Sequence, residues 1–261
     1  MKVIDTHSHF NLHQFGHDLP EAILRMVEAE VGTICVGIDL PTSDHAMRLA
    51  QEHRSIWACV GQHPTEWGIE FDAASFNKLA TEPKTVAIGE CGLDYYREQD
   101  RKAKHEQKLL FQKQIDLAHK YDLPLMLHIR AEQGGMDAYH DALAMLQETR
   151  VAWPNMRGTA HFFAGTQEIA EAFINLGFYI SFSGVITIFP EYEDLVRFVP
   201  IDRILPETDA PFATPIPYRG TRNEPAYVRE ITKKIAQVKG LSVQETEDQL
   251  LTNTKRLFNI E

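Results

Sequence analysis

The stretch AIGECGLDYY, residues 87–96, begins like the buried strand of a sheet and then places a carboxylate, Glu90, where another aliphatic residue would be expected. An unpaired charge is costly to bury at the end of a strand. Groups from elsewhere in the chain should therefore lie close enough to compensate Glu90. Short apolar runs similar to the start of this stretch recur along the chain, and their pattern predicts the fold.

Eight such runs alternate with segments of helical periodicity. The runs are VIDTHSH (3–9), TICVGI (33–38), IWACVGQH (56–63), TVAIGE (85–90), PLMLHIR (124–130), GTAHFF (158–163), FYISFSG (178–184) and RILPETDA (203–210). Strands that alternate with helices pair in parallel, and parallel strands buried on both faces show continuous apolar runs. Eight strand–helix units in 261 residues predict an α/β fold, the closed (β/α)8 TIM barrel.

The main rival fold is an open doubly wound sheet, but the chain has no GxGxxG turn after its first strand. The C-terminal segment LSVQETEDQLLTNTKRLFNI (241–260) adds one more amphipathic helix, in which Ser242 and Glu245 are spaced as a capping box. No internal repeat, low-complexity tract or linker interrupts the chain. We therefore expect residues 1–261 to form a single domain.

The composition is that of an ordinary globular protein. The N-terminus lacks the pattern of a signal peptide, and no apolar run approaches the roughly 18 residues of a membrane span. The three cysteines share no CxxC spacing, so we expect reduced thiols. Together these features predict a soluble, cytoplasmic protein without a membrane partner. A formal net charge of −11 should repel nucleic acid at long range, so a substrate phosphate would need local positive charge or metal.

Five histidines and two acids fall at or just past the predicted strand ends: His7, His9, His63, His128, His161, Glu90 and Asp209. In a barrel these ends meet on one face, where active sites of this fold are built. A lone histidine would be interpreted more simply as a loop hydrogen bond, but the shared position of the set favours a metal site. Imidazoles with carboxylates suit Zn²⁺, Mn²⁺, Ni²⁺ or Mg²⁺, and there are enough ligands for two ions, with Glu90 as a bridge.

Seven motifs along nearly the whole chain resemble the TatD family of metal-dependent hydrolases: DTHSHF (5–10), GQHP (61–64), IGECGLDYY (88–96), LHIR (127–130), HFFAG (161–165), ETDAPF (207–212) and RNEP (222–225). The resemblance implies a TIM barrel with His7, His9, Glu90 and Asp209 around one metal ion and Glu90, His128 and His161 around the other. It also implies a Mg²⁺-dependent deoxyribonuclease, a 3'-5' exonuclease that cleaves phosphodiester bonds at the ends of single-stranded DNA.

Three residues are predicted to act in catalysis. Asp209 would be the base that takes a proton from the metal-activated water, and Glu90 would hold both ions. His63 would orient the phosphate or protonate the leaving oxygen, although a hydrogen bond that shapes its loop explains it nearly as well.

Loops after the strands supply candidate substrate contacts: Tyr95, Arg130, Arg219, Arg222 and Asn223. Arg219 and Arg222 are favoured because TIM barrels commonly bind phosphate after strand eight. Asn223 is equally well explained as the start of a helix.

Two other functions remain open at this point. The same barrel and metals could hydrolyse an ester, an aminoacyl ester or an amide. A non-catalytic metal-binding protein is disfavoured, because structural metal sites are closed by four ligands and need no base. We expect a monomer whose substrate is DNA.

Overall fold

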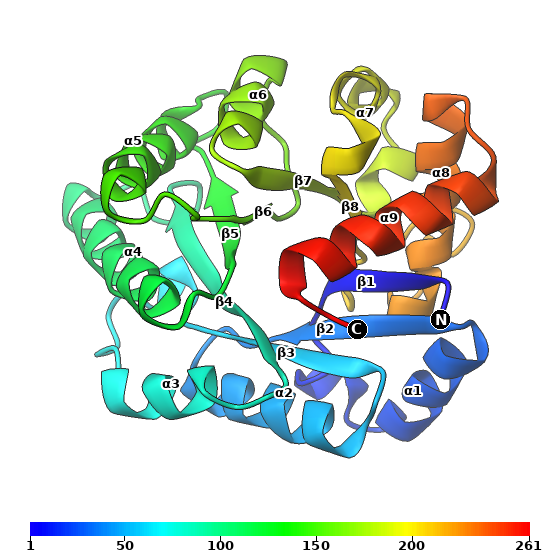
Figure 1. Cartoon of the computed structure of the whole chain (residues 1–261), viewed down its shortest axis with the longest axis horizontal. Coiled ribbons are helices and arrows are strands. Elements are labelled where there is room, and N and C mark those ends of the chain that lie inside the picture. Colours follow the sequence, from blue (N-terminus) through cyan, green and yellow to red (C-terminus); the bar gives the residue numbers. More distant parts are fainter.

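The computed structural model describes residues 1–261, and its eight strands form one parallel sheet in the order of the sequence (Figure 1). The strands are β1 (Val3–Ser8), β2 (Val31–Val36), β3 (Ile56–Val60), β4 (Thr85–Asp94), β5 (Leu125–Arg130), β6 (Gly158–Ala160), β7 (Phe178–Phe182) and β8 (Ile204–Pro206). A bridge between Ser8 and Ala210 joins β1 to the segment after β8. The sheet is thus a nearly closed barrel, and the predicted TIM-barrel fold is confirmed.

Nine α-helices surround the sheet (Figure 1): α1 (Leu19–Glu28), α2 (Leu40–Glu52), α3 (Ala73–Ala80), α4 (Arg101–Tyr121), α5 (Asp137–Ala152), α6 (Gln167–Asn175), α7 (Glu193–Phe198), α8 (Val228–Lys239) and α9 (Val243–Phe258). The predicted C-terminal helix is confirmed as α9, and its Ser242 and Glu245 form the expected capping box.

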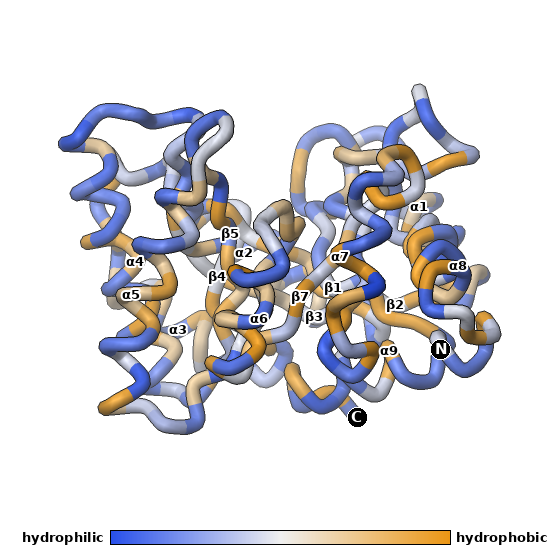
Figure 2. Tube along the Cα trace, turned by 90° about the horizontal axis from the view of Figure 1, so that it is seen from above, coloured by the Kyte–Doolittle hydropathy of each residue, from blue (hydrophilic) through white to orange (hydrophobic).

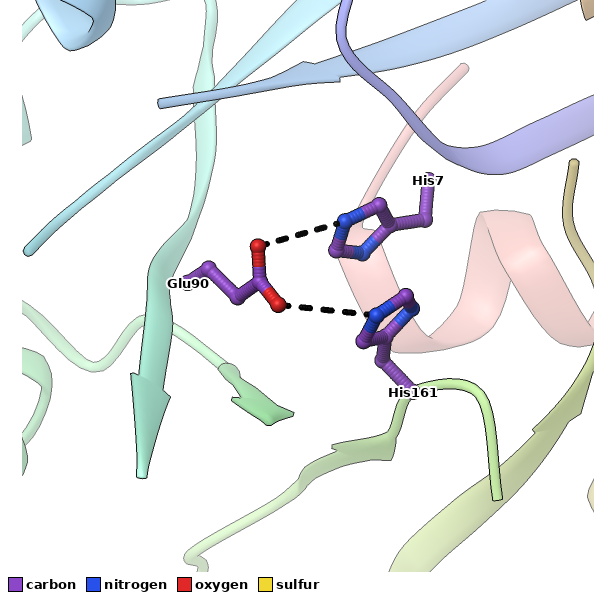
Figure 3. Close-up of side chains that lie close together, drawn as sticks. All are labelled: His7, Glu90 and His161. Carbon is purple, nitrogen blue, oxygen red and sulfur yellow. Dashed lines mark ion pairs between the residues drawn. The ribbon is translucent and has the colours of Figure 1, made fainter. Parts of the chain in front are cut away.

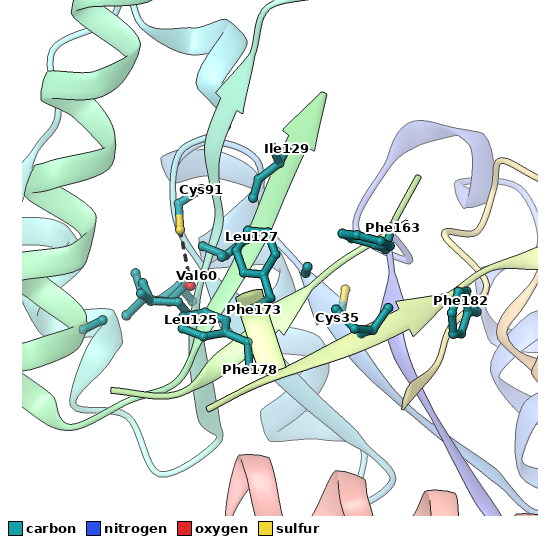
Figure 4. Packing of buried hydrophobic residues seen from close by; sticks show 14 of the residues in the cluster. Cys35, Val60, Cys91, Leu125, Leu127, Ile129, Phe163, Phe173, Phe178 and Phe182 are labelled. Atoms are coloured by element: carbon teal, nitrogen blue, oxygen red, sulfur yellow. Dashed lines mark hydrogen bonds between the residues drawn. The ribbon is translucent and has the colours of Figure 1, made fainter. Parts of the chain in front are cut away.

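The larger hydrophobic core lies between the outer faces of the strands and the helices. Figure 4 shows part of it, including Leu125 and Leu127 of β5 with Phe173 of α6 and Phe178 of β7. Figure 2 shows hydrophobic segments along the strands at the centre of the molecule and many hydrophilic segments at its periphery. This arrangement is expected for parallel strands that are buried on both faces.

A smaller core fills the barrel interior with residues from seven strands and the end of α9: Ile4, Ile34, Val36, Cys59, Val86, Ala87, Met126, Tyr179, Leu205, Leu257, Phe258 and Ile260. Asn253 of α9 donates to the carbonyl oxygens of Ile201 and Ile204, where β8 begins. The helix therefore covers the end of the barrel where the strands start. The opposite end, where the strands finish, is left for the titratable residues.

Most strands are shorter than the predicted runs, and β4 is longer. β6 ends at Ala160 and β8 at Pro206, so His161 and Asp209 lie in the segments that follow the strands. β4 instead continues past Glu90 to Asp94, so Glu90 lies within the strand rather than at its end. None of the helices is both long and apolar enough to cross a membrane.

The Phe258→Ala substitution should lower the free energy of unfolding by about 3–5 kcal/mol, because it leaves a cavity in the barrel interior. Val243, which is 40% exposed at the start of the same helix, provides a matched control. Val243→Ala should change the stability by less than about 0.5 kcal/mol. Urea denaturation followed by circular dichroism measures both variants. Equal free energies of unfolding for the two variants would contradict the conclusion that the end of α9 packs in the barrel interior.

Candidate metal centre

Glu90 is held at the centre of the site by a strand that lies unusually close to its neighbour. Gly92, two residues further along β4, has a φ of 137°. A Cβ atom added there would overlap the carbonyl oxygen of His128 on β5. Glycine therefore allows β4 to continue past Glu90 in contact with β5. The carboxylate of Glu90 is buried, with 4% of its side chain exposed.

One carboxylate oxygen of Glu90 faces two histidines at the end of β1, His7 within the strand and His9 just after it. Its Oε2 lies 3.6 Å from Nε2 of His7 and 3.7 Å from Nε2 of His9. These two nitrogens are 3.2 Å apart, and Oδ1 of Asp209 lies 3.8 Å and 3.5 Å from them. Four donor atoms at such separations can surround one ion, since metal–ligand bonds of about 2.0–2.2 Å place neighbouring ligand atoms at about these distances.

The other oxygen of Glu90 faces a second group of histidines. Its Oε1 lies 2.7 Å from Nδ1 of His128, 3.5 Å from Nε2 of His161 and 3.7 Å from Nε2 of His63. Figure 3 shows Glu90 between His7 and His161, with one oxygen directed at each ring. The two oxygens of one carboxylate thus belong to two different ligand groups.

Asp209 reaches the first group because its backbone adopts a left-handed conformation. Its φ is 55°, which is uncommon for a residue other than glycine. Its backbone N–H donates to the carbonyl oxygen of His7 at 2.9 Å. The segment after β8 is thereby attached to β1 beside the candidate ligands. Asp209 is the most accessible of the proposed acids, with 15% of its side chain exposed.

Further carboxylates orient the histidines, and the sequence interpretation had not assigned them this role. Oε1 of Glu207 lies 2.9 Å from Nδ1 of His161 and also accepts the backbone N–H of Phe162. Oδ2 of Asp94 lies 3.1 Å from Nε2 of His128. Glu207 stands in the ETDAPF motif and Asp94 in IGECGLDYY, so both motifs already contained the signal. Carboxylates behind ligating histidines fix the ring orientation and the position of the ring proton.

Asp5, which is in phase with His7 and His9 in the sequence, has a different place. Its carboxylate accepts the backbone N–H and the hydroxyl of Thr208, both at 2.7 Å. Burial raises the pKa of Asp5 well above its usual value, although these hydrogen bonds oppose the shift. This side chain joins β1 to the segment after β8 and is not directed at the candidate ions.

Burial and mutual repulsion favour neutral rings in part of the centre. Burial lowers the pKa of His7 and His63 to about 3, with neighbouring histidines adding to the effect. Burial also opposes protonation of His161, but Glu207 and Glu90 outweigh it and raise the pKa of this ring to about 9. Burial disfavours the charge of Glu90, yet the surrounding histidines, His63 foremost among the charges, hold its pKa well below the usual value.

The donor set fits divalent cations. Glu90 and Asp209 form ion pairs only with histidines, and neither lysine nor arginine compensates them. Three overlapping groups of ligand atoms each lie within 4.8 Å of one another: His7, Glu90 and His161; His7, His9 and Asp209; and His63, Glu90 and His128. Mixed imidazole and carboxylate ligands suit Zn²⁺, Mn²⁺ or related ions.

A cavity of about 690 Å³ opens beside the centre. Its lining includes three candidate ligands, two arginines and several aromatic rings: His128, His161, Asp209, Arg97, Arg130, Tyr139, Phe162, Tyr192 and Phe212. Arg130, one of the predicted substrate contacts, thus lines this cavity. Its guanidinium is 3.9 Å from the ring centroid of Tyr96, which is 46% exposed.

The structure does not bring Tyr95 to this cavity. Its ring is buried, and its hydroxyl donates to Asp141 at 2.8 Å. The nitrogen Nζ of Lys104 lies 4.4 Å from the ring centroid. The predicted substrate contact of Tyr95 is thus replaced by a packing role, because the chain turns after Asp94 so that Tyr96, and not Tyr95, is exposed.

Two residues of the loop after β8 are engaged within the protein. Arg222 donates two hydrogen bonds to Asp18, at 2.6 Å and 2.8 Å. Asn223 is buried and donates to the carbonyl oxygen of Thr208 at 2.8 Å. Both side chains therefore brace the loop. The position of Asn223 fits the interpretation as a helix start better than that as a substrate contact. Arg219 is exposed in the same loop.

The chain is similar to known proteins over nearly its full length. The family model described as TatD related DNase matches residues 4–259. An uncharacterized metal-dependent hydrolase of Bacillus subtilis, YabD, is 38% identical over 263 residues, covering 99% of each chain. The protein named 3'-5' ssDNA/RNA exonuclease TatD in Klebsiella pneumoniae is 33% identical over 259 residues, covering 95% of this chain and 94% of its own.

Among solved structures, the TatD homologue YjjV of Escherichia coli superimposes with a TM-score of 0.88 at 27% sequence identity. The match covers 100% of this chain and 99% of the other. The family model spans nearly the whole chain, and relatives above 30% identity are matched over almost their full length. The chain therefore belongs to the TatD family of metal-dependent hydrolases.

Proposed function

We propose that this protein is a 3'-5' exonuclease that hydrolyses phosphodiester bonds at the ends of single-stranded DNA with the help of two divalent metal ions. The observation that carries the proposal is the position of Glu90, whose two oxygens face two separate ligand groups beside an arginine-lined cavity. One ion would be held by His7, His9, Glu90 and Asp209, and the other by Glu90, His128 and His161.

Bound in this way, the two ions would lower the pKa of the attacking water and neutralise charge on the phosphoryl group. Asp209 is the residue suited to take the proton of that water, because it lines the cavity and is partly exposed. Glu90 is almost completely buried and serves as a ligand. The same roles of the two ions, Asp209 and Glu90 would apply to the hydrolysis of a phosphodiester or of a carboxylic ester.

Local groups favour a nucleic acid over a carboxylic ester. Arg97 and Arg130 supply positive charge at the cavity, which a chain of net charge −11 needs to attract phosphate. Phe212 lines the same cavity and is 48% exposed, so it offers a face on which a base can stack. The exonuclease name of the Klebsiella relative supports the same substrate class.

The protein should bind two Mn²⁺ ions per chain in isothermal titration calorimetry after treatment with a chelator. Glu90→Gln should weaken binding at both sites by at least about tenfold, because one carboxylate contributes to each. Glu171→Gln, on the exposed face of α6, is the matched control and should bind as the wild type does. Undiminished binding of two ions by Glu90→Gln would contradict the bridging role.

With Mg²⁺ or Mn²⁺, the protein should release mononucleotides from the 3' end of a 5'-labelled single-stranded oligonucleotide. Asp209→Asn should lower kcat by about 100-fold or more, because the water loses its proton acceptor. Denaturing gel electrophoresis follows the shortening of the strand. Turnover of carboxylic esters or amides without any cleavage of DNA would instead establish the rival hydrolase.

Arg130→Gln should weaken DNA binding in a way that depends on salt. In the Asp209→Asn background, the slope of log K against log [KCl] should become shallower by about 0.7, the value for one phosphate contact with a single strand. Fluorescence anisotropy with a labelled oligonucleotide measures the slope. Lys255→Gln, exposed on α9 at the opposite end of the barrel, should leave it unchanged. A slope equal to that of the parent protein would exclude Arg130 from the phosphate contact.

A further inference from the structure

His63 differs from the other histidines of the centre in the partner of its Nδ1 atom. The backbone N–H of Thr65 donates to this nitrogen at 3.2 Å, and the hydroxyl of Thr65 lies 2.7 Å from it. A backbone N–H can only donate, so Nδ1 of His63 must present its lone pair. A neutral ring then carries its single proton on Nε2, and a doubly protonated ring is excluded.

His9 and His161 have the opposite arrangement. Nδ1 of His9 lies 3.0 Å from the carbonyl oxygen of Val36, and Nδ1 of His161 lies 2.9 Å from the carboxylate of Glu207. A carbonyl oxygen can only accept, so Nδ1 of His9 carries a proton, and the negative charge of Glu207 favours a proton on the nearby Nδ1 of His161. The lone pair of the neutral ring is then on Nε2, which faces Glu90. This is the form that binds a metal ion.

The Nε2–H group of His63 points into the centre without a partner in the protein. Its nearest carboxylate oxygen, Oε1 of Glu90, is 3.7 Å away, too far for a hydrogen bond. The ring lies edge-on to that of His128, with the centroids 4.3 Å apart. A nitrogen that carries a proton cannot bind a metal ion. His63 therefore cannot serve as a ligand in this tautomer, although it stands among the ligands.

We infer that His63 is a hydrogen-bond donor to the substrate and not a metal ligand, with its Nε2–H directed at a non-bridging oxygen of the scissile phosphate. This inference rests on the proposed function for the identity of the substrate, but the tautomer does not depend on it. A fixed donor near an oxygen that gains negative charge stabilises the transition state. Thr65 is the positioning residue, since its N–H selects the tautomer. It lies in the 3-10 turn Pro64–Glu66, which begins directly after His63.

Long-range ¹H–¹⁵N correlation spectra of ¹⁵N-histidine-labelled protein test the tautomer in the unaltered chain. With Mg²⁺ present, His63 should show a protonated Nε2 and an unprotonated Nδ1, and His161 should show the reverse. The spectrum of His63→Leu assigns the signals of His63. A proton on Nδ1 of His63 would overturn the inference.

The ligand and donor roles also separate in a set of three variants. His63→Leu should bind Mn²⁺ within twofold of the wild type while its kcat on single-stranded DNA falls about 100-fold or more. His161→Leu should lose metal affinity by about 10–100-fold. His105→Leu, on the exposed face of α4, is the control and should change neither quantity. A loss of Mn²⁺ affinity in His63→Leu equal to that in His161→Leu would show that His63 is a ligand, and unchanged kcat would show that it does not meet the substrate.

The experiments also separate this inference from the proposed function. If the wild type cleaves no DNA, the exonuclease proposal fails and the phosphate assignment fails with it. The spectra and the Mn²⁺ affinities still decide between donor and ligand, because neither measurement depends on a substrate.

Discussion

The buried charge of Glu90 is the constraint on which the rest of the site depends. This carboxylate is almost completely sealed from solvent, and every ion-pair partner it has is a histidine. A buried anion without a compensating cation would strongly destabilise the fold. Divalent ions at its two oxygens would supply that compensation and would at the same time create the catalytic centre. Stability and function would therefore both require divalent ions beside Glu90.

The barrel brings candidate ligands from distant parts of the chain to one end, around Glu90. His7 lies in β1 and His9 just after it, His128 lies in β5, and the segments after β6 and β8 supply His161 and Asp209. Polar groups such as Asp5, Asp94 and Glu207 then fix the directions of the backbone and the rings. At the opposite end, α9 closes the interior with apolar side chains. One end of the barrel is thus closed by apolar side chains, and the other end holds the candidate metal ligands.

Much of the fold and the convergence of the candidate ligands could be predicted from the sequence, because parallel strands carry continuous apolar runs and their ends converge. The helices α3 and α7, of 8 and 6 residues, are too short for their sequences to show a clear helical period. α8 follows shortly after the helix start considered at Asn223, and its buried Val228, Ile231 and Ile235 have helical spacing. Side-chain partners outside the ligand set could not be predicted, so Tyr95 was expected to contact substrate although it is buried. A single domain and a monomeric state remain predictions.

The measurement that tests the central claim most directly is anomalous diffraction from crystals of this protein grown with Mn²⁺. Two anomalous peaks should appear, one beside each carboxylate oxygen of Glu90. The first should lie among His7, His9 and Asp209 and the second among His128 and His161. A single ion held by one oxygen, or Glu90 without any ion beside it, would contradict the account.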